Sequence, residues 1–191
     1  MNILDGLKKF WKYLKRDSWD SWIVSLILAF VIIKFVFFPL LSFVMAAPLP
    51  LVVVESCSMY HSTDFDDWWD RNEVWYENRD IFKGDFENFP FKNGLNKGDI
   101  ILVSGRVEYS IGDIIIFDSS SNYRFPLIHR VIEEEPIETK GDNNFGQLEV
   151  ERDIDEEMVL GKSIARIPGL GWVKLIFFEG TRADNERGFC R

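Results

Sequence analysis

The sequence predicts a mostly β protein, in which a compact, coiled β-sheet domain follows one N-terminal transmembrane helix. Two observations support this fold class. A long apolar run ends near Met45, and short β-branched runs separated by glycine- and aspartate-rich turns follow it. The length of 191 residues suits one soluble domain plus one membrane anchor.

Residues 1–20 form a basic segment. Its apolar residues fall at the spacing of one helical face, and they are Leu7, Phe10, Trp11 and Leu14. This pattern predicts a helix on the cytoplasmic surface of a membrane, and a solvated tail is the alternative.

Residues 21–46 are predicted to be a transmembrane helix. Lys34 is the only charged residue between Trp22 and Met45, and about 20 apolar residues are enough to cross a bilayer. Pro39 is expected to kink the helix. The alternative, a removed signal peptide, would need a shorter apolar core and a better cleavage site than Ala-Ala-Pro at 46–48.

The distribution of basic residues predicts the orientation of the chain. Lysine and arginine precede the apolar run, and neither occurs between Ala46 and Asp70. The positive-inside rule therefore places the N-terminus in the cytoplasm and a single-pass anchor in the cell membrane. The domain at 47–178 would then lie on the extracytoplasmic face.

The segments expected as strands are short and lie between turns. They are 51–54, 99–103, 114–117, 127–132, a strand ending at Lys140, 158–166 and 171–177, with a Ser/Asn turn at 119–122. An acidic, tryptophan-rich insertion at 62–93 breaks this pattern and reads as a helical excursion with loops. Its tryptophans could touch a membrane, line a substrate groove or pack together. Residues 179–191 form a polar C-terminal tail.

Composition excludes some classes of partner. With a net charge of −9, the chain lacks the excess of positive charge that binds a phosphate backbone, so we expect no nucleic-acid partner. Cys57 and Cys190 form neither a spaced disulfide framework nor a metal-ligand pattern. We therefore expect two free thiols and no metal site.

Ser58 is the candidate nucleophile, because it lies where the apolar run gives way to the soluble domain. A serine hydroxyl is weakly nucleophilic near neutral pH and needs a base within hydrogen-bonding reach. In an extended segment Ser56 shares a face with Ser58. The Ser56 hydroxyl and the Ser58 backbone N–H could therefore stabilise a tetrahedral oxyanion.

His129 is the candidate base, and it lies within a strand-like segment. His61 is a rival, but it follows Ser58 by only three residues, and a base from another strand gives better geometry. Asp142 lies in a Gly-Asp-Asn-Asn turn and is the candidate acid that orients His129.

Taken in order, four motifs resemble the sequence boxes of type I signal peptidases. They are Ser-Cys-Ser-Met at 56–59, Gly-Asp-Ile-Ile-Ile-Phe at 112–117, Ile-His-Arg-Val at 128–131 and Thr-Lys-Gly-Asp-Asn-Asn at 139–144. The resemblance covers about residues 20–175 without the insertion. Bacterial members carry a lysine at the position of His129, so the chain resembles the archaeal and endoplasmic-reticulum branch.

The resemblance implies a membrane-anchored serine endopeptidase that removes signal peptides after small residues, with a mostly β fold and no cofactor. The expected partners are signal-peptide-bearing preproteins, membrane lipid and the secretion translocon. By the same resemblance Ser58 is the nucleophile, His129 the base and Asp142 the first acidic residue.

The chain departs from the family pattern at two positions. His61 stands where the family usually has proline, and Leu148 stands where it has a second aspartate. Either Asp142 alone orients His129 or another acid does so, and the candidates are Glu149, Glu151 and Asp153.

Two other classes of function remain open. One is a catalytically inactive, membrane-anchored β-module that binds a protein partner, and the missing second aspartate favours it. The other is a self-cleaving or regulatory serine peptidase of related fold. Such enzymes pair serine with lysine, whereas this chain has His129 at that position.

Overall fold

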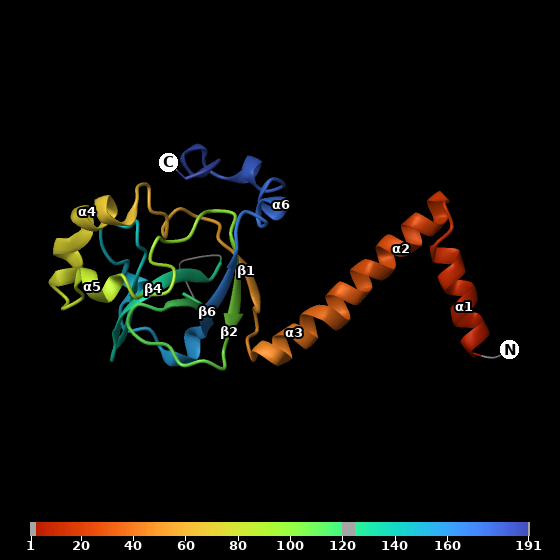
Figure 1. Cartoon of the computed structure of the whole chain (residues 1–191), viewed down its shortest axis with the longest axis horizontal. Helices are drawn as coiled ribbons and strands as arrows, with labels where there is room; N and C mark the ends of the chain where they lie inside the picture. Colours follow the sequence, from red (N-terminus) through yellow and green to blue (C-terminus); the bar gives the residue numbers. More distant parts are fainter. Residues whose placement is uncertain (1–2, 120–124, 191) are drawn as a thin grey trace. The chain divides into compact units, whose positions relative to one another are not determined.

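The structure is a computed structural model that describes residues 3–119 and 125–190 (Figure 1). Residues 1–2, 120–124 and 191 lie outside this description, so the predicted Ser/Asn turn at 119–122 and the extreme ends of segments 1–20 and 179–191 fall partly outside it. The chain divides into two compact units, Met1–Val44 and Met45–Arg191.

The first unit is helical. Helix α1 (Ile3–Leu14) confirms the helical spacing found within residues 1–20, and no residue of α1 is buried. The second helix runs from Trp19 to Met45 and has a mean hydropathy of 2.7. Its 27 residues span roughly 40 Å at 1.5 Å per residue, so by length and composition this helix could cross a membrane.

The long helix changes geometry before Pro39. It consists of α2 (Trp19–Ile32), a π-helical segment η1 (Ile33–Phe37) and α3 (Phe38–Met45). Proline lacks an N–H and its ring crowds the carbonyl four residues earlier, within η1. A π-helical turn is one local adjustment that accommodates such a defect.

The second unit is built around a six-stranded antiparallel sheet in the order β1-β2-β6-β3-β4-β5. Its strands are β1 (Leu51–Val53), β2 (Ile100–Ser104), β3 (Ile114–Phe117), β4 (Leu127–Glu134), β5 (Ile137–Lys140) and β6 (Val159–Ile167). Buried aliphatic side chains of β2 and β3 form the main core with Val54, Met59 and Leu95. Six of the seven predicted strand segments therefore correspond to strands.

The seventh segment, 171–177, is not a strand. It forms the short helix α6 (Trp172–Leu175), which follows the turn at Pro168-Gly169. A short apolar run without alternation fits a helix as well as a strand. Here Leu175 is buried while Val173 and Ile176 are exposed, as the helical period requires.

The expectation of a mostly β chain overstates the strand content. Helices hold about 39% of the described residues and strands about 19%. The strands have three to nine residues each, whereas the N-terminal helices and helix α4 (Phe65–Glu77) are long. The short helices also contribute, among them α5 (Lys83–Phe86), η2 (Glu149–Glu151), η3 (Glu156–Met158), η4 (Glu179–Thr181) and η5 (Asp184–Glu186).

The insertion at 62–93 forms a small aromatic core of its own beside β4 (Figure 1). Asp64 is the N-cap of helix α4, and its side chain accepts a hydrogen bond of 3.0 Å from the Asp67 backbone N–H. Trp68 and Trp69 are buried against Tyr76 and Phe86. For these two tryptophans the structure favours packing over contact with a membrane or a substrate.

Truncating this aromatic core should destabilise the domain. We expect Trp69→Ala to lower the free energy of unfolding by about 3–5 kcal/mol, because the side chain is buried and leaves a cavity. Val74→Ala on the same helix is the control, since Val74 is 69% exposed and should change stability by no more than about 0.5 kcal/mol. Urea unfolding followed by circular dichroism measures both, and equal effects would contradict the assignment of a separate core.

Candidate active site

The candidate nucleophile lies in a tight loop after β1, which we call the serine loop (Glu55–Tyr60). Val54 and Met59 are buried in the main core on either side of Ser58. The Met59 carbonyl accepts a hydrogen bond of 2.7 Å from the Leu95 N–H, and the Tyr60 N–H donates to the Cys57 carbonyl at 3.1 Å. The apolar residues of the motif therefore hold the polar ones at the edge of the core.

Ser58 and His129 lie in hydrogen-bonding contact. The Nε2 atom of His129 is 2.9 Å from the Oγ atom of Ser58, although 71 residues separate them in the chain. His129 comes from the middle of β4, opposite Ile115 on β3, and its side chain is buried. The antiparallel sheet thus places the His129 ring next to the serine loop.

Glu151 occupies the other side of the His129 ring. Its Oε1 atom lies 2.5 Å from His129 Nδ1, in a close contact that is not aligned as a hydrogen bond. The other carboxylate oxygen accepts a hydrogen bond of 2.5 Å from the Leu148 backbone N–H. Glu151 is fully buried at the end of η2, whereas Glu149 and Asp153 are exposed. Of the three alternative acids, the structure brings Glu151 to His129.

The carboxylate of Asp142 faces different partners. Arg130 donates two hydrogen bonds to it, of 2.9 Å from Nε to Oδ1 and 2.7 Å from Nη2 to Oδ2. His61 Nε2 lies 3.0 Å from Oδ2. The expectation that Asp142 orients His129 is therefore corrected by the geometry. Neighbouring side chains on a strand point to opposite faces, so an acid that pairs with Arg130 lies away from His129.

His61, the rival base, belongs to this second cluster. Its ring stacks on Trp68 with the centroids 3.9 Å apart, and its Nε2 atom is engaged by Asp142. The hydroxyl of Tyr76 lies 3.5 Å from the same carboxylate. The insertion therefore covers the buried cluster that contains Asp142 and His61.

The turn that carries Asp142 also supports the serine loop. The Asn143 N–H donates to the Ser58 carbonyl at 2.7 Å, and the Asn143 side chain donates to the Cys57 carbonyl at 3.0 Å. A Cβ atom at Gly141 would lie 2.9 Å from the Ser58 carbonyl oxygen, so only glycine permits this approach. The Gly-Asp-Asn-Asn motif thus positions the candidate nucleophile through its backbone.

Burial and neighbouring charges shift the pKa values of several groups in this cluster, Asp142 and Lys140 among them. Burial alone raises the pKa of the Asp142 carboxyl, but the charge of Arg130 and the hydrogen bonds from His61 and Arg130 outweigh it and hold that pKa well below its usual range. Burial lowers the pKa of Lys140 to about 8, although Asp142 and Glu151 oppose this shift.

Breaking the Arg130–Asp142 pair should destabilise the fold. Asp142→Asn leaves the fully buried Arg130 without its counter-charge, which costs about 3–5 kcal/mol. The folded-state pKa of Asp142 is depressed, so this stabilisation is present above the unfolded value of about 3.9 and is lost as the pH falls below it.

Urea unfolding of wild type and Asp142→Asn at pH 7 and pH 3 measures the effect of the pair. The difference between the two proteins should shrink at pH 3. Asp153→Asn is the control, because Asp153 is exposed and its positive φ of 52° suits asparagine. If Asp153→Asn lowered the free energy of unfolding as much as Asp142→Asn, the account would be contradicted.

Ser56 lies where an oxyanion donor is expected. Its Oγ atom is 3.1 Å from the Ser58 Oγ atom and accepts a weak hydrogen bond of 3.5 Å from the Ser58 backbone N–H. The Ser56 hydroxyl, one of the two groups predicted to stabilise an oxyanion, therefore adjoins the Ser58 hydroxyl. Within residues 3–119 and 125–190 no group of three or more His, Cys, Asp or Glu side chains is placed to hold a metal ion.

Cys57, between the two serines, forms a disulfide with Cys190 across 133 residues of sequence. The expectation of two free thiols is wrong. The C-terminal tail folds back onto the serine loop and brings the two Cα atoms to 5.6 Å, which the spacing of the cysteines could not reveal.

The chain is similar in sequence to a subunit of a signal peptidase complex. No family model matches the chain. The signal peptidase complex catalytic subunit SEC11 of Lachancea thermotolerans is 31% identical over 104 residues, which cover 47% of this chain and 61% of that protein. The chain thus spans less than two-thirds of the length of this relative. The similarity supports a place in the type I signal peptidase family.

Proposed function

We propose that the chain is a membrane-anchored serine endopeptidase that removes N-terminal signal peptides from secreted preproteins after small residues. The observation that carries this proposal is the contact of 2.9 Å between Ser58 Oγ and His129 Nε2, with Glu151 on the far side of the ring. The similarity to a signal peptidase catalytic subunit supports the choice of substrate class.

The catalytic cycle uses the three side chains in turn. Ser58 Oγ attacks the scissile carbonyl while His129 Nε2 takes its proton, and the negative charge of Glu151 stabilises the imidazolium. The tetrahedral intermediate collapses as His129 gives the proton to the leaving amine, which leaves the signal peptide esterified to Ser58. His129 then takes a proton from a water molecule that hydrolyses this ester. The scheme requires no cofactor.

Ser56 should contribute to stabilisation of the oxyanion. We expect Ser56→Ala to lower kcat by about 10²- to 10³-fold with little change in KM, because the hydroxyl assists only the transition state. Ser62→Ala is the control, since Ser62 is an exposed serine just beyond the serine loop. A preprotein cleavage assay measures both variants. A change confined to KM would mean that Ser56 acts in substrate binding.

The apolar helix would place this chemistry at the membrane. With the basic segment in the cytoplasm, the helix Trp19–Met45 would anchor the peptidase domain on the extracytoplasmic face of the cell membrane. There, membrane lipid and the secretion translocon would be its neighbours. Confinement to the surface where signal peptides emerge raises the effective substrate concentration. The substrate would bind as an extended strand, with shallow pockets for small side chains.

Cleavage of a secretory preprotein by the detergent-solubilised full chain tests the proposal. We expect one cut after a small residue, mapped by mass spectrometry of both fragments. A preprotein with a bulky residue at that position should resist cleavage. If the folded chain leaves the preprotein intact while a known signal peptidase cleaves it, the proposal fails.

A further inference from the structure

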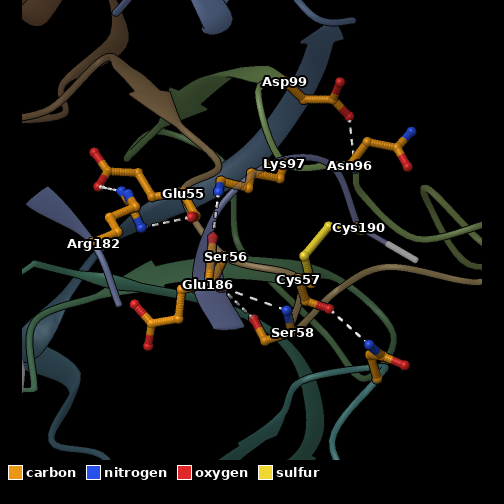
Figure 2. Close-up of a disulfide and its surroundings, with 12 residues drawn as sticks. Glu55, Ser56, Cys57, Ser58, Asn96, Lys97, Asp99, Arg182, Glu186 and Cys190 are labelled. Atoms are coloured by element: carbon orange, nitrogen blue, oxygen red, sulfur yellow. Dashed lines mark hydrogen bonds and ion pairs between the residues drawn. A yellow bond between two sulfur atoms is a disulfide. The ribbon is translucent and has the colours of Figure 1, made fainter. Parts of the chain in front are cut away.

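The C-terminal tail is attached to the serine loop at several points. We call Glu179–Cys190 the strap. Its last described residue, Cys190, is bonded to Cys57, which lies between Ser56 and Ser58 (Figure 2). Since the hydroxyls of Ser56 and Ser58 lie 3.1 Å apart, the disulfide holds the loop at the residue between them.

Electrostatic contacts form a second attachment, at the first residue of the serine loop. Arg182 contacts the Glu55 carboxylate through Nη2 at 2.5 Å and donates from Nη1 to the Glu55 carbonyl at 2.9 Å. Lys174, which precedes the strap, lies 2.8 Å from the other carboxylate oxygen. Figure 2 shows Glu55 and Arg182 facing one another. Glu55 is thus held through both its side chain and its backbone.

A third contact fixes the strap to the sheet domain. The buried Lys97 donates to the Glu186 carbonyl at 2.6 Å (Figure 2) and pairs with the Glu179 carboxylate at 2.8 Å. The strap is therefore bound to the protein body at both ends. On its other side the serine loop is held by Asn143, so the strap and the Gly-Asp-Asn-Asn turn support the loop together.

We propose that the strap positions the nucleophile, and that Arg182 and Cys190 are positioning residues for Ser58. The inference rests on the proposed function, since it assigns the strap a role in the same reaction. Neither residue contacts the hydroxyl of Ser58; they act through Glu55 and Cys57, its neighbours in the loop. A disulfide at this place also suits an oxidising, extracytoplasmic site of action.

Three variants of the full chain test the strap. Arg182→Met removes the contacts to Glu55, and Cys190→Ser removes the disulfide. Arg182→Lys restores one contact, because lysine cannot reach the carboxylate and the carbonyl together. Arg71→Met is the matched control, since Arg71 is exposed and its hydrogen bonds go to Thr63 and Asp67. Circular dichroism at the assay temperature establishes that each variant is folded.

Two readouts are compared, hydrogen exchange of the serine-loop amides and preprotein cleavage. We expect Arg182→Met and Cys190→Ser to exchange these amides at least tenfold faster and to lose at least tenfold in kcat, with KM within twofold. Arg182→Lys should show exchange rates and kcat between those of Arg182→Met and wild type. Arg71→Met should match wild type in both quantities.

The possible outcomes separate this inference from the proposed function. Unchanged exchange in folded Arg182→Met and Cys190→Ser would overturn the role of the strap, whatever the activity. Faster exchange with unchanged kcat would also overturn it, because the strap would then order the loop without being needed to position Ser58 for catalysis. If wild type cleaves nothing, the proposed function fails, and the exchange data alone decide whether the strap orders the loop.

Discussion

Replacing Ser58 with alanine should abolish preprotein cleavage, with a fall in kcat of about 10⁴- to 10⁶-fold. The Ser58 hydroxyl is the group that bonds to the scissile carbonyl in our mechanism, and its oxygen lies 2.9 Å from Nε2 of His129, the proposed base. Single-turnover cleavage of a radiolabelled preprotein provides the dynamic range that this measurement needs.

The substitution should leave the fold intact, because it removes one oxygen from a loop whose anchors are the buried Val54 and Met59. His129→Ala should lose activity to a similar extent, since nucleophile and base act as one unit and their effects do not add. Ser62→Ala should cleave like wild type. Near-normal activity in Ser58→Ala would mean that another residue carries out the attack.

Replacing Glu151 with glutamine should lower kcat by about 10³- to 10⁴-fold. The carboxylate beside His129 Nδ1 favours the ring tautomer that leaves Nε2 free to accept the Ser58 proton, and it stabilises the imidazolium that follows. Glutamine keeps the size of the side chain and can still accept the hydrogen bond from Leu148, so the η2 turn should persist.

Glu149→Gln is the matched control, because it makes the same chemical change two residues away at an exposed site. Steady-state kinetics with one preprotein compare the two variants, and circular dichroism verifies that both are folded. Equal activities would show that Glu151 does not orient His129. A large loss in Asp142→Asn under conditions where it stays folded would instead return the orienting role to Asp142.

The order of the motifs was enough to predict that Ser58 and His129 act together, because the segments that contain them resemble sequence boxes of one family. The acid could not be identified in the same way. Asp142 is in the expected motif, but its partner is settled by the alternation of side chains along β4, which presents Arg130 to Asp142 and His129 to Glu151. Which acid lies beside His129 also depends on the three-dimensional path of the chain through η2.

The insertion and the tail set similar limits on prediction. The sequence indicated helix within 62–93, but composition alone could not show that Trp68 and Trp69 pack inward beside His61. The contact between Cys57 and Cys190 joins residues 133 positions apart, so it depends on how the tail folds back onto the serine loop. The β-branched strands were easier to predict, since their signal is local, whereas the apolar run at 171–177 fits a strand or a helix.

The geometry also bears on the other classes of function. The missing second aspartate was the feature that favoured an inactive binding module, and a buried carboxylate now stands beside His129 in the form of Glu151. A serine–lysine peptidase would need a lysine near Ser58, where this chain has His129. Both observations support the proposed serine–histidine mechanism over these two alternatives.

The most direct test of the central claim is mass spectrometry of the full chain, acid-quenched during its first turnover of a preprotein. The account predicts the signal peptide joined as an ester to the tryptic fragment that contains Ser58, and no such adduct in Ser58→Ala. An acyl group on a different side chain, or first-turnover cleavage by Ser58→Ala at the wild-type rate, would contradict it.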